Sequence, residues 1–304
     1  MLRELIALGI RLTGLPWLIR NTYARRKVTI ILYHDPKPGQ FERHMAYLSN
    51  RYRFISFDDL LSAIQSRDWQ HIPHKALIVT FDDGHRGNYA LLDIFRKYGL
   101  RPTIYLVTQV VGTLRHFWFC HPGVDCDPII QLQTEDRNRI LRDHYSFDPL
   151  KEYPTDQRHA LSCDEIEEMK SHVDFQPHTQ FHPILPLTPD DESRCEIADS
   201  KRDLESMLGR RCDHFSYPNG QYSSRDVEYV RQAGFLTSRT VDVGWNDLQT
   251  DPLKLKITGV TDDASVNVLA AQLSGITMFL RYLLRGSLTG KFIPTQTAAA
   301  NNSR

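Results

Sequence analysis

Two adjacent carboxylates, Asp82 and Asp83, stand directly after an apolar run and directly before Gly84. The run, Ala76–Phe81, is typical of a strand that is buried on both faces. Burying an unpaired carboxylate is costly, and two neighbouring carboxylates repel each other. A bound cation would remove that cost. The alternative interpretation is an ordinary turn in which one aspartate caps the following helix.

Two histidines, His178 and His182, lie four residues apart after another predicted strand. This spacing can bring both imidazoles to one cation, and because Pro183 follows we expect a loop rather than a continuing helix. One carboxylate with two neutral imidazoles is a recurring open metal site. The second aspartate would then serve as a base beside it. Taken alone, the histidine pair could also be a surface coincidence.

Predicted strands and helices alternate along most of the chain, with about seven strand–helix repeats and no cluster of hairpins. We therefore expect an α/β fold with parallel strands, either an open sheet or a barrel. In such folds the chemistry collects at the carboxyl ends of the strands. Four polar segments follow predicted strands, namely residues 33–35, 82–83, 178–182 and 217–220. Their shared location predicts one site.

Net charge and cysteine content indicate which partners and which cellular compartment to expect. The formal net charge is +0, so no global field recruits nucleic acid and we expect no nucleic-acid partner. The five cysteines form no CxxC pair, which argues against a disulfide framework and fits a reducing compartment. The N-terminus lacks a signal-peptide pattern. These features predict a cytoplasmic protein.

The two ends of the chain differ from the middle. Residues 1–27 combine apolar residues with six basic ones and one acid, Glu4, which predicts a basic, apolar helical extension. Such a segment can lie on an anionic membrane surface, or it can pack on the core with its arginines in solvent. We expect one domain over residues 28–276. Residues 277–304 are expected to form a helix of similar character and a disordered tail.

The motifs resemble those of the polysaccharide deacetylases of carbohydrate esterase family 4, also called the NodB-homology family. Thr80-Phe81-Asp82-Asp83-Gly84 is similar to the family's TFDDG motif, and the segment 178–182 to its H-[S/T]-x-x-H motif. The segment 215–220 looks like a variant of its RxPxG motif. Tyr33-His34 resembles a pair found in the exopolysaccharide-associated branch. The family fold is a distorted (β/α) barrel with fewer strands than a TIM barrel, which we expect here with about seven parallel strands.

The resemblance implies a role for each motif residue. Asp83, His178 and His182 would bind a divalent metal, usually zinc, and Asp82 would be the general base. The metal and a backbone N–H near Asn219 would stabilise the oxyanion formed from the acetyl group.

Three departures from the family pattern stand out. Ser216 occupies the position where many members have an arginine that steadies the catalytic aspartate, and a serine cannot form a charged bidentate pair. The segment 242–245, Asp-Val-Gly-Trp, matches the family's later Asp-x-Asp-Trp motif only in part. No histidine lies near residues 255–260, where relatives have the general acid. His34 is our candidate for that acid, with His85 and His121 as weaker ones.

Aromatic residues near the expected mouth could stack on sugar rings, although aromatic residues more often lie in the core. The predicted substrate- or oxyanion-binding residues are Tyr217, Pro218, Asn219, Trp118 and Trp245.

The function implied by the resemblance is metal-dependent removal of the N-acetyl group from an N-acetylated sugar in cell-surface polysaccharide biosynthesis. The substrate would be a glycan or a lipid-linked sugar, with peripheral contact to the inner membrane face through the termini. Two alternatives remain open. One is deformylation or another amide hydrolysis on the same scaffold, and the other is a glycan-binding protein without turnover.

Overall fold

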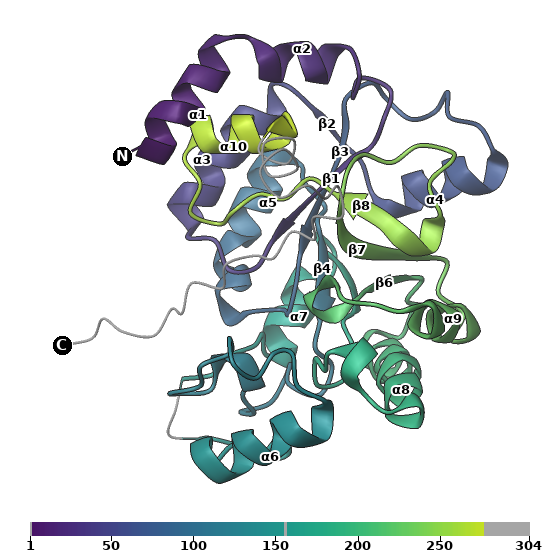
Figure 1. The fold of residues 1–304 in the computed structure, drawn as a ribbon. Coiled ribbons are helices and arrows are strands. Elements are labelled where there is room, and N and C mark those ends of the chain that lie inside the picture. The colour runs from purple at the N-terminus through teal and green to yellow at the C-terminus, as the bar shows by residue number, and fades with distance from the viewer. Residues whose placement is uncertain (1, 155–156, 277–304) are drawn as a thin grey trace.

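The computed structural model describes residues 2–154 and 157–276, in which helices and strands alternate (Figure 1). The strands are β1 (Thr29–Tyr33), β2 (Arg53–Phe54), β3 (Ala76–Phe81), β4 (Thr103–Leu106), β5 (Asp174–Pro177), β6 (His214–Ser216), β7 (Thr237–Val243) and β8 (Leu255–Ile257). All pairings between these named strands are parallel. The expected α/β architecture with parallel strands is therefore confirmed. The predicted segment 277–304 lies outside the described residues.

Helices connect the strands. The α-helices are α1 (Leu2–Leu12), α2 (Leu15–Asn21), α3 (Pro38–Ser49), α4 (Phe57–Ser66), α5 (Leu92–Tyr98), α6 (Thr134–Tyr145), α7 (Cys163–Met169), α8 (Asp190–Leu208), α9 (Ser224–Gln232) and α10 (Val266–Leu273). Short 3₁₀ turns are η1 (Arg86–Leu91), η2 (Trp118–Cys120), η3 (Leu185–Leu187), η4 (Pro218–Gly220) and η5 (Pro252–Lys254). Ser56 and Ser162 begin α4 and α7 with capping boxes, and Gly209 ends α8 in the left-handed conformation.

The strands are arranged in two sheets. One has the order β1-β3-β4-β5, with β2 added beside the start of β3, and the other has the order β6-β7-β8. At the seam between β1 and β8, the N–H of Thr258, which follows β8, donates to the carbonyl of Ile30 in β1 over 2.8 Å. At the other seam, the Gln176 side chain accepts from the His214 N–H over 3.0 Å. These contacts draw the two sheets into an incomplete barrel.

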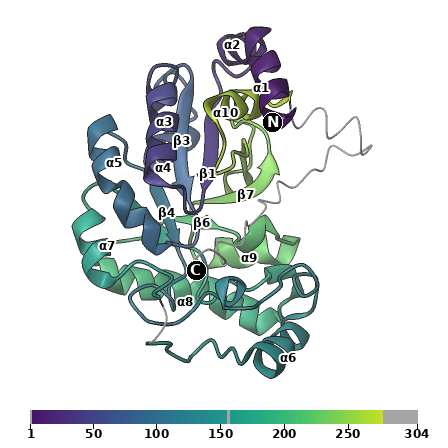
Figure 2. The same cartoon turned by 90° about the vertical axis from the view of Figure 1, so that its left-hand side faces the viewer.

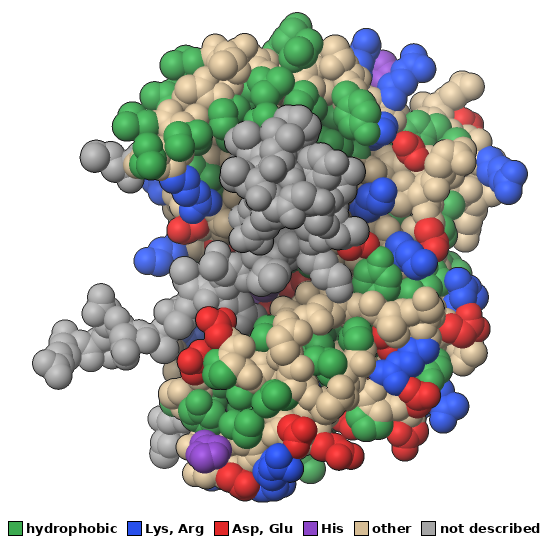
Figure 3. Space-filling model, viewed as in Figure 1, with side chains coloured by type: hydrophobic (Ala, Val, Ile, Leu, Met, Phe, Trp, Pro, Cys, Tyr) green, Lys and Arg blue, Asp and Glu red, His purple; other side chains and the backbone are tan. Residues whose placement is uncertain are grey.

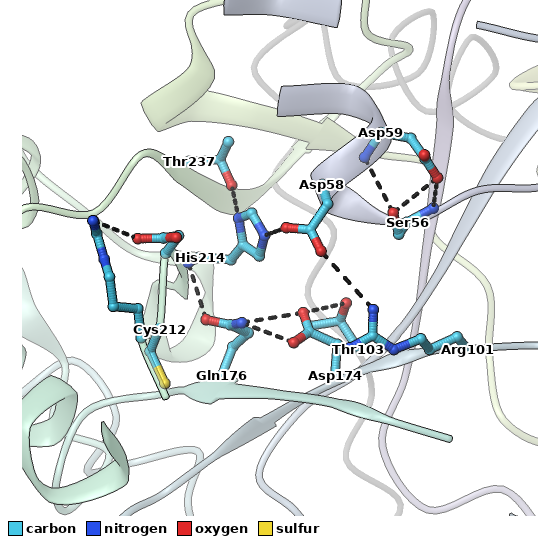
Figure 4. Close-up of polar contacts among 12 residues, drawn as sticks. Ser56, Asp58, Asp59, Arg101, Thr103, Asp174, Gln176, Cys212, His214 and Thr237 are labelled. Atoms are coloured by element: carbon cyan, nitrogen blue, oxygen red, sulfur yellow. Dashed lines mark hydrogen bonds and ion pairs between the residues drawn. The ribbon is translucent and has the colours of Figure 1, made fainter. Parts of the chain in front are cut away.

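The seam between β5 and β6 is polar and lies at the amino ends of the strands (Figure 4). Gln176 Nε2 donates to the Asp174 carboxylate, while its oxygen accepts from the His214 N–H. The His214 ring lies 2.8 Å from Thr237 Oγ1 and 3.3 Å from Asp58 Oδ1. Because buried polar groups are stable only when partnered, this network joins the two sheets specifically.

The core lies on both faces of the larger sheet. All residues of β1 and β3 are buried, as expected for parallel strands covered on two sides. On one face Tyr33, Phe41, Phe81 and Phe95 form an aromatic cluster under α3 and α5, the helices beside the strands in Figure 2. This packing fixes the carboxyl ends of β1 and β3, from which the polar segments emerge.

The N-terminal segment forms α1 and α2, which lie over α10 at the top of Figure 1. Most of residues 2–21 is therefore helical, and the division of the chain at residue 27 stays a prediction. Within the described ranges, none of the helices combines the length and the apolar character that crossing a bilayer requires.

Candidate metal centre

The predicted site residues follow the carboxyl ends of neighbouring strands. His34 follows β1, the pair Asp82 and Asp83 follows β3, and His178 follows β5. Asp83 has a left-handed backbone with φ 71°, and Gly84 follows with φ 73°. A side chain at Gly84 would come within 2.4 Å of Leu106, so only glycine fits this turn. The sharp turn aims both carboxylates back over the strand ends.

Asp83, His178 and His182 converge on one point. Ligand atoms from the three residues all lie within 4.8 Å of one another, and all three side chains are buried. Asp83 Oδ1 lies 3.4 Å from His182 Nε2 and 3.7 Å from His178 Nε2. Asp83 Oδ1 and His178 Nε2 have no hydrogen-bond partner among the described residues. Buried polar atoms in proteins usually have partners, and these two converge on one point, so the pair fits a bound cation. Carboxylate with imidazole suits zinc.

The protonation of the two histidines favours metal binding. His178 Nδ1 lies 2.7 Å from the Ser216 carbonyl, which can only accept, so Nδ1 carries the proton and Nε2 presents its lone pair. Burial lowers the pKa of His182 to about 3, although the Asp83 carboxylate opposes that effect. The His182 ring is therefore available in the neutral form that binds metal, and the His178 ring is oriented with Nε2 toward the same point.

His85 holds the other oxygen of Asp83. Its Nε2 lies 3.1 Å from Asp83 Oδ2, so Oδ1 alone faces the two ligand histidines. Burial opposes the charged form of His85, but the hydrogen bond and the charge of Asp83 outweigh it and raise the pKa of His85. Burial likewise disfavours the Asp83 carboxylate, yet His85, His182 and His34 together hold the pKa of Asp83 well below its usual range. His85 therefore orients Asp83, and its role as a weaker candidate acid stays a prediction.

The segment between the two histidines is a loop, as expected, with a strained backbone that is held by hydrogen bonds. Thr179 and His182 have left-handed backbones with φ 65° and 60°, which is rare for residues other than glycine. The Thr179 hydroxyl accepts from the His182 N–H over 3.0 Å. The Glu196 carboxylate of α8 accepts from the N–H groups of Gln180 and Phe181 over 2.7 and 3.0 Å. Glu196 is thus a positioning residue that the sequence pattern did not reveal.

Replacing Glu196 with glutamine should flatten the pH dependence of stability. Burial raises the pKa of Glu196 from 4.5 to about 7, although the two backbone N–H groups oppose the shift. The folded state therefore keeps its proton to higher pH than the unfolded state, and the wild type loses unfolding free energy as the pH rises through that window. We expect up to ~1 kcal/mol per pH unit in the wild type and a smaller slope in Glu196→Gln.

Urea unfolding at several pH values between about 5 and 7 measures these slopes. Glu167→Gln, at an exposed acid of α7, is the matched control and should keep the wild-type slope. Equal slopes in all three proteins would show that Glu196 does not carry the effect.

Asp82 is paired with a buried arginine that sequence analysis missed. Nη2 of Arg239, in β7, donates to both oxygens of Asp82 and to Ser216 Oγ. Arg239 is completely buried, and the register of β6 and β7 places it beside Ser216. The charge expected at position 216 therefore comes from the neighbouring strand. The signal in the sequence was one arginine inside a strand, flanked by the small residues Ser238 and Thr240.

His34 lies at the partly exposed rim of the same site. Its backbone N–H and that of Asp35 donate to the carboxylate of Asp262, at distances from 2.8 to 3.3 Å. Its carbonyl accepts from Asn88 Nδ2 over 2.7 Å. The residue expected to act as acid is therefore held near Asp83 by its backbone. Asp262, in the loop after β8, was also missed by sequence analysis.

The structure places the predicted aromatic residues away from an open sugar surface. Trp118 is buried, and its indole N–H donates to the His182 carbonyl over 2.9 Å, so it supports the ligand loop. Tyr217 is fully buried, with its hydroxyl donating to the Leu253 carbonyl. Neither ring fits the expected stacking on sugar, because neither presents a free face.

Trp245 and the η4 turn complete the predicted set. Trp245 packs edge-to-face on Tyr23, and the next residue, Asn246, pairs with Val28 at the amino end of β1. Because the site lies at the carboxyl ends of the strands, Trp245 is not part of it. Pro218 is buried, whereas Asn219 is partly exposed in the left-handed conformation with φ 55°. The turn follows β6 beside Ser216, which keeps an oxyanion-binding role for the backbone near Asn219 a prediction.

Comparison with known proteins identifies a family whose matched region includes the site residues. A family model described as polysaccharide deacetylase matches residues 70–238, which include Asp82, Asp83, His178 and His182. YxkH of Bacillus subtilis (strain 168), whose name assigns it to the polysaccharide deacetylases, is 24% identical over 230 residues. That stretch covers 72% of this chain and 66% of YxkH, slightly less than two thirds of the relative.

Solved structures share the fold. The Streptococcus pyogenes deacetylase PplD, in complex with acetate, has a TM-score of 0.60 at 18% sequence identity. The match covers 81% of this chain and 98% of PplD. IcaB from Ammonifex degensii has a TM-score of 0.59 at 18% identity, covering 82% of this chain and 97% of its own. The family match spans more than half of the sequence, and the fold agrees with it. The chain belongs to the polysaccharide deacetylase family of hydrolases.

Proposed function

We propose that this protein is a metal-dependent hydrolase that removes the N-acetyl group from an N-acetylated sugar in cell-surface polysaccharide biosynthesis. The observation that carries the proposal is the buried convergence of Asp83, His178 and His182 beside the arginine-bound Asp82. Such a site has three ligands and a separate carboxylate, a combination that suits metal-assisted hydrolysis of an amide.

Each residue has a distinct role in the proposed reaction. Asp83, His178 and His182 would hold a divalent ion, most simply zinc, and a bound ion supplies Lewis-acid polarisation of the acetyl carbonyl. Asp82 accepts the proton of the attacking water, and Arg239 keeps its carboxylate in place. The backbone near Asn219 offers an N–H to the developing oxyanion. His34, on the opposite rim, supplies a proton to the leaving amine.

Acetate release is the direct test of this function. The protein, freed of metal by chelation and then reloaded with Zn²⁺ or other divalent ions, is incubated with GlcNAc-containing oligosaccharides, and acetate and formate are both measured. We expect acetate that depends on metal. Formate from N-formylated sugars alone would indicate a deformylase, and metal-dependent glycan binding without product would indicate a binding protein.

Replacing His34 with asparagine tests the proposed acid. We expect kcat on an N-acetylated sugar to fall by ~10²–10⁴-fold, because the leaving amine must be protonated. Cleavage of 4-nitrophenyl acetate should change little, since its leaving group needs no proton. Equal losses on both substrates would instead indicate that His34 only supports the structure of the rim.

A cytoplasmic location remains part of the proposal. All five cysteines are free thiols, which is consistent with a reducing compartment.

A further inference from the structure

The N-terminal helices present an apolar face to solvent. Of the large hydrophobic residues that are exposed in the described ranges, eight belong to this segment and three lie elsewhere. The eight are Leu2, Leu5, Ile6, Leu8, Leu12, Trp17, Leu18 and Tyr23, of which Leu12 is 77% and Leu2 is 72% exposed. We call these eight side chains the apolar face. Figure 3 shows hydrophobic side chains gathered over α1 and α2 at the top of the molecule.

The helix α1 has the reverse of the usual amphipathic arrangement. Its polar side chains face the protein: Glu4 accepts from Ser265 and Asn267, and Arg11 donates to the Asn267 side chain over 2.6 Å. Ile10 packs against the core, whereas the other large apolar side chains of α1, namely Leu2, Leu5, Ile6, Leu8 and Leu12, are exposed. A helix packed only for stability buries its apolar stripe and exposes its charges. This arrangement therefore indicates an apolar medium on the outer side, because clustered apolar exposure of this kind marks an interaction site.

Basic side chains accompany the apolar face. Arg25 and Arg26 are exposed. Arg3 and Arg11 donate to Thr261 and Asn267, and Glu4, the one acid among the first 27 residues, is engaged by α10 and its cap. Exposed arginines beside a cluster of leucines that also includes Trp17 and Tyr23 match the chemistry of an anionic lipid surface.

We propose that the apolar face docks in the plane of a bilayer that contains anionic phospholipid. Its helices are too short to span, so they would lie at the boundary between headgroups and acyl chains, with the arginines among the headgroups.

The docking face lies one loop away from the catalytic rim. Arg3 donates to Thr261 over 3.0 Å and Glu4 binds Ser265, while Asp262 between them binds the backbone of His34. Docking would therefore bring the rim close to the lipid surface. Resting on the proposed function, this arrangement favours an N-acetylated sugar carried on a lipid over a free polymer.

Vesicle flotation tests the docking surface. The full chain is mixed with vesicles of phosphatidylcholine alone or with about one third phosphatidylglycerol, a composition that gives a negative surface. We expect flotation with the anionic vesicles and weaker flotation at high salt. Leu5→Ser with Ile6→Ser, and separately Arg25→Glu with Arg26→Glu, should each weaken the apparent affinity by roughly ten-fold or more. Leu150→Ser and Arg202→Glu, at exposed residues elsewhere, are matched controls that should bind like the wild type.

Three outcomes would overturn the proposal. One is wild-type protein that does not float, or variants that float equally well. Another is a dimer in sedimentation analysis that Leu5→Ser with Ile6→Ser dissociates, since a second copy would then occupy the face. A third is flotation only after removal of residues 277–304, which would make that segment the occupant. Flotation without acetate release would refute the proposed function and leave the docking surface standing.

Discussion

Replacing Asp82 with asparagine is expected to lower kcat by ~10²–10⁴-fold, because an amide cannot accept the proton of the attacking water. The metal content should stay that of the wild type, since Asp83, His178 and His182 are unchanged. Steady-state acetate release and metal analysis on the same preparation measure the two quantities. The separation of activity from metal binding is the feature that distinguishes a base from a ligand.

Asp83→Asn is the matched control, because it makes the same replacement of a carboxylate by an amide at the neighbouring residue. It should lose metal as well as activity, since Asp83 Oδ1 faces both ligand histidines. An Asp82→Asn protein that keeps full activity with a normal metal content would contradict the assignment of the base. Loss of metal from Asp82→Asn would show that the two aspartates share the ligand role.

Local signals in the sequence explain where individual helices and strands begin and end. The capping serine Ser56, the glycine Gly209 and the continuous apolar run of β3 act within a few residues of where they stand. The division of the strands into two sheets could not be read in this way. It depends on contacts such as that between Gln176 and His214, residues 38 apart in sequence, whose pairing no local pattern encodes.

The same distinction holds for the site. The convergence of the Asp82–Asp83 pair with His178 and His182 was predictable because these segments follow strands, and strand ends meet in parallel folds. The choice of Asp83 as the ligand came from the family resemblance. Arg239 was not predicted, since its role depends on lateral register with Ser216. The aromatic predictions failed for another reason. Residue type does not tell whether a ring such as Tyr217 faces the core or a ligand, and here it lies in the core.

Replacing Arg239 with methionine is expected to destabilise the protein by ~3–5 kcal/mol, because it leaves the buried Asp82 carboxylate without its partner. The activity should also fall, since the base loses the group that fixes its orientation. Urea unfolding at constant metal concentration measures the stability. Adding Asp82→Asn should recover part of the lost stability but none of the activity. Equal stability of Arg239→Met and wild type would contradict the role of the pair.

A transfer of the guanidinium between strands tests the position rather than the mere presence of the charge. Ser216 and Arg239 are register partners in β6 and β7, and the Ser216 hydroxyl already contacts the guanidinium. Arg239→Ser should behave like Arg239→Met, whereas Arg239→Ser combined with Ser216→Arg places an arginine at the partner position. If Asp82 needs a buried guanidinium from either strand, the double variant should recover activity above that of Arg239→Ser. Losses that simply add would mean that only β7 can deliver the charge, because the space beside β6 is fixed by the packing of Ser216.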